Sequence, residues 1–240
     1  MVITVSRELG SQGSYMAAEA AERLGFRFLD REILQRAAAA AGYPDERMVR
    51  NLAEQEEVPG FVERVIRALG SMSAVPSIPS ATLREGASYA ELADSMVSSA
   101  LIAERDRERA AANYRELVRQ VIQDYAEAGD VIIVGRGGQV ILQNRRNALH
   151  VRVFASPEIR IRNLVSRENL DREVAEEEIR TSDRQRARYL QRYHGVDWQD
   201  PGLYHLTINA DHVPVAMGAM IIVEATRWLA QSLGESLPGA

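Results

Sequence analysis

Residues 2–30 hold a strand, a glycine-bearing turn, a helix and a second strand, and this unit strongly limits the folds open to the chain. Residues 2–5 (VITV) are all β-branched, as in a buried parallel strand. Apolar residues then recur at helical spacing over residues 14–24, and Gly25 is placed to end that helix. Residues 26–29 form the next strand. A strand that leads through a helix to another strand predicts an α/β protein.

The turn at residues 6–13 is suited to binding phosphate, because glycines let the backbone approach an anion and unpaired N–H groups at a helix start point toward it. The Walker A pattern G-x-x-x-x-G-K-[ST] is absent, since Gly10 and Gly13 are spaced differently. No lysine occurs anywhere, so all 29 basic residues are arginine. Taken alone, the turn fits an ordinary strand-to-helix connection equally well.

The composition is that of a soluble globular protein, with 46% hydrophobic and 26% charged residues. A length of 240 residues allows one large α/β domain or two small ones. The net charge of −5 argues against a whole surface that binds polyanions, so any nucleic-acid or phosphate site must be a local cluster. Cysteine is absent, which excludes thiolate metal sites and cysteine nucleophiles. No apolar run reaches the roughly 20 residues of a membrane span, and we expect a cytoplasmic protein.

Three further strands are predicted at residues 131–134, 149–154 and 206–209, each followed by a helical pattern. The first of them runs into Gly135-Arg136-Gly137-Gly138, a second glycine loop at a helix start. Five strands separated by helices predict a doubly wound parallel sheet. Ligands of such sheets bind at the carboxyl ends of the strands, which is where both glycine loops would lie.

The segment 45–110 has the pattern of amphipathic helices, interrupted near Pro59-Gly60 and by a serine- and proline-rich stretch at residues 70–80. A long polar helix is predicted over residues 171–193. On it Arg184, Arg188 and Arg192 share one face, and Arg186 is turned away from them. Such a row can hold phosphate oxygens, although a solvated surface helix paired with nearby glutamates is the alternative.

Three more polar residues fall near the expected carboxyl edge. Asp30 ends the second strand and could orient a metal or a ribose hydroxyl, or simply cap the next helix. Arg36 follows six residues later, and Arg136 lies in the second glycine loop, where it could contact a substrate phosphate or form a structural ion pair.

Six collinear segments together resemble the cytidylate-kinase-like family of P-loop nucleoside monophosphate kinases. They are VITVSRELGSQG, LDREIL, VIIVGRG, FASPEIR, SDRQRARY and GVDWQDPGLYHLTIN. The resemblance covers most of residues 2–30 and 114–225. It implies a P-loop NTPase-type sheet in the order 2-3-1-4-5, within a single domain over residues 1–240. It also implies a helical insertion for the monophosphate at 45–110 and an arginine-rich lid at 171–203.

The resemblance also implies roles for individual residues. Asp183, Arg184 and Arg188 correspond to the catalytic lid set, and Ser14 would help to hold Mg²⁺. The ATP-binding residues would be Gly10, Ser11, Gln12, Gly13, Ser14 and Tyr15, and the substrate-binding residues would be Asp30, Arg36, Arg136 and Arg186. Two positions depart from the family pattern: Gly137 stands where cytidylate kinases have aspartate, and Ser14 stands where the kinase-like branch tends to have arginine.

The leading hypothesis is a phosphotransferase that uses ATP and Mg²⁺ to phosphorylate a nucleoside monophosphate or a related small phosphate acceptor. The alternative is a nucleotide-binding regulator or scaffold of the same fold, weak or inactive in catalysis, which the serine at position 14 favours. A third hypothesis is a helical interaction protein in which the segment 45–110 forms a homodimer surface. No membrane or nucleic-acid partner is expected under any of them.

Overall fold

The computed structural model describes residues 1–30 and 115–238. The chain divides into two units, and nearly all described residues belong to the unit formed by Met1–Tyr43 and Leu117–Ala240. The predicted insertion at 45–110, with its homodimer surface, lies outside the described residues. So does Arg36.

Five parallel strands form one sheet: β1 (Val2–Arg7), β2 (Arg27–Leu29), β3 (Val131–Val134), β4 (Ala148–Phe154) and β5 (Leu206–Asn209). Their order is β2-β3-β1-β4-β5, which confirms the predicted doubly wound, P-loop-type topology. In the centre, Val5 pairs with Val134 on one side and Val151 on the other. The carboxyl ends of the three central strands therefore lie at the same edge of the sheet.

The helices are α1 (Gly13–Leu24), α6 (Gly138–Ile141), α7 (Pro157–Glu168), α8 (Arg172–His194) and α9 (Val215–Leu233), with a 3-10 turn η1 at Pro201–Leu203. Helices α1 and α8 begin and end within one residue of the predicted ranges, 14–24 and 171–193. Residues 115–127 are also helical. Gly25 ends α1 in a left-handed conformation, as its position predicts. Ser156 is the N-cap residue of α7, but its side chain forms no capping hydrogen bond.

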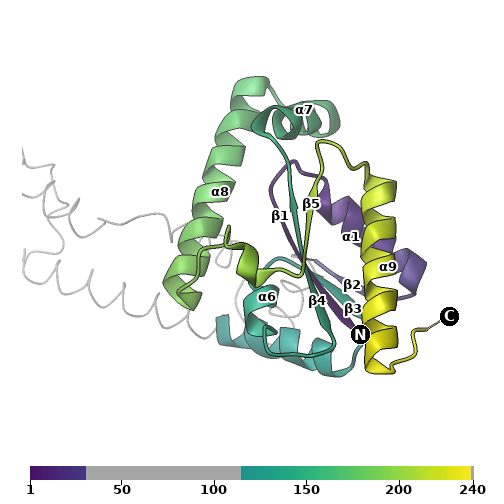
Figure 1. Cartoon of the computed structure of the whole chain (residues 1–240). Coiled ribbons are helices and arrows are strands. Elements are labelled where there is room, and N and C mark those ends of the chain that lie inside the picture. The colour runs from purple at the N-terminus through teal and green to yellow at the C-terminus, as the bar shows by residue number, and fades with distance from the viewer. Residues whose placement is uncertain (31–114, 239–240) are drawn as a thin grey trace, which may run out of the picture. The chain divides into compact units, whose positions relative to one another are not determined.

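The two faces of the sheet differ in chemistry. Helices α1 and α9 lie on one side of the sheet and α8 lies on the other (Figure 1). The side under α1 and α9 is apolar, with Ile3 and Val5 of β1 in a continuous hydrophobic core. The alternate residues of β1, Thr4 and Ser6, point to the other side, where Thr4 Oγ1 lies 2.8 Å from His150 Nδ1. One strand thus contributes to the core on one face and to a buried polar layer on the other.

Within residues 1–30 and 115–238, no helix has both the length and the apolar character that crossing a membrane would require.

Candidate nucleotide site

The first glycine loop (residues 6–13) joins β1 to the N-terminus of α1. Gly10 and Gln12 both have left-handed backbone conformations, with φ of 79° and 63°. Among the described residues, the backbone N–H groups of Gly10, Gln12 and Ser14 have no hydrogen-bond acceptor, whereas those of the next two residues bond to Gln12 O. Several unpaired N–H groups next to a helix N-terminus form a concave anion-binding site.

Ser11 and Tyr15, both predicted to bind ATP, have different environments. Ser11 is buried, and its hydroxyl donates a 2.8 Å hydrogen bond to Glu8 O and accepts one from Gly13 N–H. The Ser11 side chain therefore fixes the shape of the loop. The Tyr15 ring is exposed beyond the loop, with the guanidinium of Arg167 4.6 Å from its centroid.

Helix α7 holds the loop from outside. Arg160 Nε donates to Leu9 O at 2.7 Å, and Asn163 Nδ2 donates to Gly10 O at 2.8 Å. A Cβ atom on Gly10 would lie only 2.6 Å from Arg160 O, so glycine is needed there for the close approach of α7 as well as for the positive φ. Sequence reasoning did not identify Arg160. The sequence did offer one sign of its burial: Arg160 lies four positions before Leu164, and therefore on the same buried face of α7.

Asp183, predicted to be catalytic, is tied to this same arginine. Arg160 Nη1 and Nη2 donate to the two Asp183 carboxylate oxygens at 2.8 and 2.9 Å. Arg160 is buried and lies 3.4 Å from Glu8 as well, and Arg186 Nη1 reaches Asp183 at 3.4 Å. Asp183 therefore links α8 to α7 and, through Arg160, to the first glycine loop.

Arg186 faces the sheet, from the side of α8 opposite the row of Arg184, Arg188 and Arg192. Its guanidinium lies 5.0 Å from the Trp198 ring centroid, and Arg152 of β4 lies 5.1 Å from the same ring. Burial, the largest influence, lowers the pKa of Arg186 below that of a free arginine, against the opposing effect of Asp183. Arg152, which sequence reasoning also missed, forms an ion pair with Glu8 at 3.4 Å.

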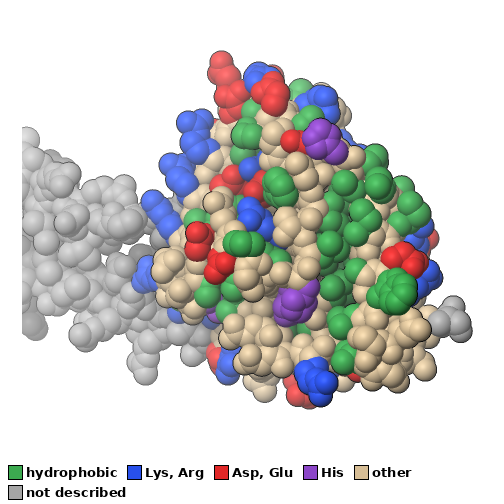
Figure 2. Space-filling model, in the orientation of Figure 1, with side chains coloured by type: hydrophobic (Ala, Val, Ile, Leu, Met, Phe, Trp, Pro, Cys, Tyr) green, Lys and Arg blue, Asp and Glu red, His purple; other side chains and the backbone are tan. Residues whose placement is uncertain are grey.

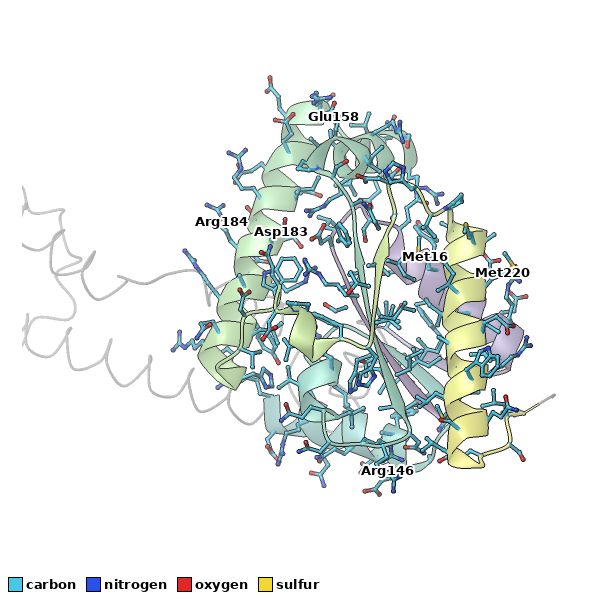
Figure 3. All side chains as sticks on the ribbon, in the orientation of Figure 1. Met16, Arg146, Glu158, Asp183, Arg184 and Met220 are labelled. Atoms are coloured by element: carbon cyan, nitrogen blue, oxygen red, sulfur yellow. The ribbon has the colours of Figure 1, made fainter. Side chains whose placement is uncertain are left out.

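Arg184 and Arg188 lie on the opposite face of α8. Figure 3 shows Asp183 directed toward the sheet and Arg184 directed away from it, where Arg184 donates to Glu177 and Thr181 at 3.3 and 3.2 Å. Basic side chains line the outer edge of this helix in Figure 2, and the exposed arginines at four-residue spacing are Arg180, Arg184, Arg188 and Arg192. In this conformation α8 presents Arg186, and not Arg184 or Arg188, to the sheet.

The second glycine loop (residues 135–138) lies beside the first. Arg136 has a left-handed φ of 56°, and its Nη2 atom is buried without a hydrogen-bond partner among the described residues. Asp30 lies at the end of β2 and is partly buried. A buried guanidinium nitrogen with open hydrogen-bonding capacity is suited to an anionic group of a ligand.

A neighbouring arginine bears on the predicted metal role of Ser14. Arg7, the last residue of β1, donates from Nε to Ser14 Oγ at 3.1 Å. In the described part of the chain, no group of three or more His, Cys, Asp or Glu side chains could hold a metal ion. Ser14 is thus the one predicted protein ligand of Mg²⁺, and its hydroxyl oxygen already accepts a hydrogen bond from the cationic side chain of Arg7. This arrangement fits phosphate well and fits a Ser14-bound Mg²⁺ poorly.

Comparison with known proteins gives a consistent result. The sequence matches the cytidylate kinase-like family over residues 2–212. Among solved structures, the chain is similar to an uncharacterized protein from Eubacterium ventriosum ATCC 27560, with a TM-score of 0.61 and 16% identity over 95% of this chain and 98% of that one. It is also similar to shikimate kinase from Bacteroides thetaiotaomicron, with a TM-score of 0.43 and 14% identity over 95% and 98% of the two chains. Among curated proteins, no sequence matches this chain significantly. At 16% identity, the likeness to the Eubacterium ventriosum protein shows a shared fold.

Proposed function

This chain belongs to the cytidylate kinase-like family, and from that premise we propose that it transfers the γ-phosphoryl group of ATP to a nucleoside monophosphate or a related small phosphate acceptor. The observation that carries the proposal is the set of three unpaired N–H groups, on Gly10, Gln12 and Ser14, at the N-terminus of a twelve-residue helix. They provide hydrogen bonds and positive potential for the β- and γ-phosphates of ATP.

The reaction needs little beyond positioning and charge stabilisation. An oxygen of the acceptor phosphate attacks the γ-phosphorus, the bond from that phosphorus to the β,γ-bridging oxygen breaks, and its electron pair stays on ADP. Since the attacking phosphate oxygen already carries negative charge, no side chain has to remove a proton. Mg²⁺ bound to the nucleotide would neutralise part of the phosphate charge.

The acceptor is assigned to the neighbouring strand ends. Arg136 would bind its phosphate through the open Nη2 position, and Asp30 and Arg36 would bind or orient the rest of the acceptor. Asp183 would act by fixing Arg160, and Arg186, beside Trp198, is the arginine of α8 that faces the sheet. Arg184 and Arg188 would reach the transferring group only after α8 rotates or shifts. We place the reaction in the cytoplasm.

The proposal is tested by incubating the purified full chain with MgATP and, separately, CMP, dCMP, UMP and AMP, and by measuring ADP and the diphosphate product together. Arg136→Gln is expected to raise the KM for the acceptor, and Arg146→Gln, an exposed arginine elsewhere on the surface, is the matched control (Figure 3). Absence of ADP with every acceptor would contradict the kinase proposal.

A nucleotide-binding regulator is the second candidate. It is favoured by two contacts: the Ser14 hydroxyl is bonded to Arg7, and the Arg160–Asp183 pair fixes α8 to the first glycine loop in one arrangement. Tight ATP binding in calorimetry, with no transfer to any acceptor, is the result this candidate requires.

A further inference from the structure

We infer that the Arg7 guanidinium supplies the positive charge that P-loop enzymes otherwise obtain from a lysine, and that it binds the β- and γ-phosphates of the nucleotide. The inference rests on the proposed nucleotide site and names a residue that the sequence patterns did not single out. The chain has no lysine at all, so this charge must come from arginine.

The position of Arg7 follows from the end of β1. A Cβ atom on Gly13 would lie 2.6 Å from the Cβ of Arg7 and 2.9 Å from the Cβ of Val153. Glycine at position 13 therefore leaves room for the stem of Arg7 to pass over the start of α1. A side chain at position 13 would have to displace it.

The head of Arg7 lies between the two glycine loops. Its Nε donates to Ser14 Oγ at 3.1 Å, and its Nη1 is the closest atom, at 3.2 Å, to where a Cβ of Gly135 would be. The guanidinium thus lies beside the first glycine loop, with its unpaired N–H groups, and also beside the loop that carries Arg136. This is the region in which donor and acceptor phosphates would meet.

The donors at this position are suited to an anion. A helix N-terminus carries a partial positive charge and attracts anionic groups. Arg7 is held by Ser14 at the positive end of α1, beside the open N–H groups of Gly10 and Gln12. A phosphate bound there would accept from the backbone and the guanidinium together, and arginine suits this because its planar donors can bind two oxygens at once.

The test measures how the full chain discriminates between nucleotides. Isothermal titration calorimetry with ATP, ADP and AMP is run on wild type, Arg7→Gln, Arg7→Lys and, as matched control, Arg23→Gln, which removes an exposed arginine at the other end of α1. Arg7→Gln is expected to weaken ATP and ADP at least tenfold and to change AMP, which lacks the β- and γ-phosphates, less than threefold. Arg7→Lys is expected to lose part of this affinity, and Arg23→Gln none.

The outcomes separate the two proposals. If wild type binds ATP and Arg7→Gln binds it equally well, the inference about Arg7 is overturned and the nucleotide site stands. If wild type binds no nucleotide, both are overturned. Circular dichroism melting shows whether each variant is folded, and if Arg7→Gln is not, Arg7→Met takes its place, with ATP affinity equal to that of wild type overturning the inference. The double variant Arg7→Gln/Ser14→Lys adds a rescue, because an ammonium at position 14 would occupy the place of the lost Arg7 contact and is expected to restore part of the ATP affinity.

Discussion

The two glycine loops look alike in sequence, since each follows a buried strand and opens a helix, but they differ in what holds them. The first is bonded to α7 through Leu9 O and Gly10 O and leads into the twelve-residue α1. In the second, Gly135 N–H bonds to Val5 O and Gly138 N–H bonds to Gly135 O, and the following helix has four residues. Only the first combines a long helix N-terminus with a rigid external support.

The difference shows that the glycine pattern does not by itself define a phosphate site. A short helix contributes little dipole, and a loop without a fixed shape cannot hold several N–H groups in convergent directions. The support comes from Arg160, some 150 residues away in the sequence. Three predictions test this contrast, in order of decreasing effect on stability.

The largest effect is expected for Arg160→Met. It removes the hydrogen bond to Leu9 O and the buried cation that Asp183 and Glu8 share, and leaves each carboxylate only a 3.4 Å contact, to Arg186 and Arg152 respectively. Breaking a buried ion pair from one side lowers the free energy of unfolding by about 3–5 kcal/mol, and nucleotide binding should weaken as the first glycine loop loosens. Urea denaturation measures the free energy of unfolding, and isothermal titration calorimetry measures the affinity for the nucleotide.

Arg172→Met is the matched control. Arg172 also bridges α8 and α7, through Glu158 at 2.8 Å, but both side chains are exposed. Exposed pairs contribute little, so the urea midpoint should stay essentially unchanged. Equal effects of the two substitutions would mean that Arg160 does not support the first glycine loop in the way described.

A smaller loss of stability is expected for Gly10→Ala, and Gly135→Ala is the variant with which it is compared. The two glycines have nearly equal φ, 79° and 78°, so alanine adds similar backbone strain of about 1 kcal/mol at either position. At Gly10 the new methyl also meets Arg160 O at 2.6 Å, whereas at Gly135 the nearest atom is the movable tip of Arg7 at 3.2 Å. We expect a loss of about 3 kcal/mol for Gly10→Ala and about 1 kcal/mol for Gly135→Ala, measured as unfolding free energies.

We expect the protein to lose stability at acid pH because of His150, which lies beneath the second glycine loop. Gly138 rests on Thr4, whose hydroxyl contacts His150. Burial and, to a lesser degree, the neighbouring His205 lower the pKa of His150 to about 4. Since the histidine pKa is about 6.5 in the unfolded chain, the unfolded state binds more protons between these values.

Stability contributed by neutral His150 is therefore present above pH 6.5 and is lost as the pH falls toward 4. At pH 5 the loss should be about 2 kcal/mol relative to pH 7. Urea denaturation of wild type and His150→Gln at both pH values isolates this contribution, and an equal pH dependence in the two proteins would assign the acid sensitivity to other groups.

The strands could be predicted because they depend on local pattern, and their order was implied by the resemblance to the cytidylate-kinase-like family. The runs at residues 131–134 and 206–209 are strands over those bounds, and Gly25 ends α1 as expected. Helical spacing also separated Arg186 from Arg184 and Arg188. Which face of α8 turns inward could not be predicted, because it depends on Asp183 meeting Arg160 and on Trp198 receiving Arg186.

The roles of Arg7 and Arg160 were beyond sequence reasoning for a similar reason. In the sequence, Arg7 is simply the last residue of a predicted strand. Its position beside the first glycine loop depends on the close approach of its side chain to Gly13. Arg160 reads as one of several arginines in a polar helix, and only the return of the chain through α8 gives it a buried carboxylate. Predicted roles in catalysis and substrate binding remain predictions until kinetic measurements on the variants above.

The placement of Trp198 has a practical consequence. The protein has two tryptophans, and they are in contrasting surroundings: Trp198 is buried between Arg152 and Arg186, and Trp228 is 70% exposed on α9. In a Trp228→Phe variant the whole indole emission comes from a ring that touches both the sheet and α8. Any separation of α8 from the sheet changes the polarity around that ring, so the chain carries its own optical reporter of α8 movement, readable in a stopped-flow instrument without an added dye.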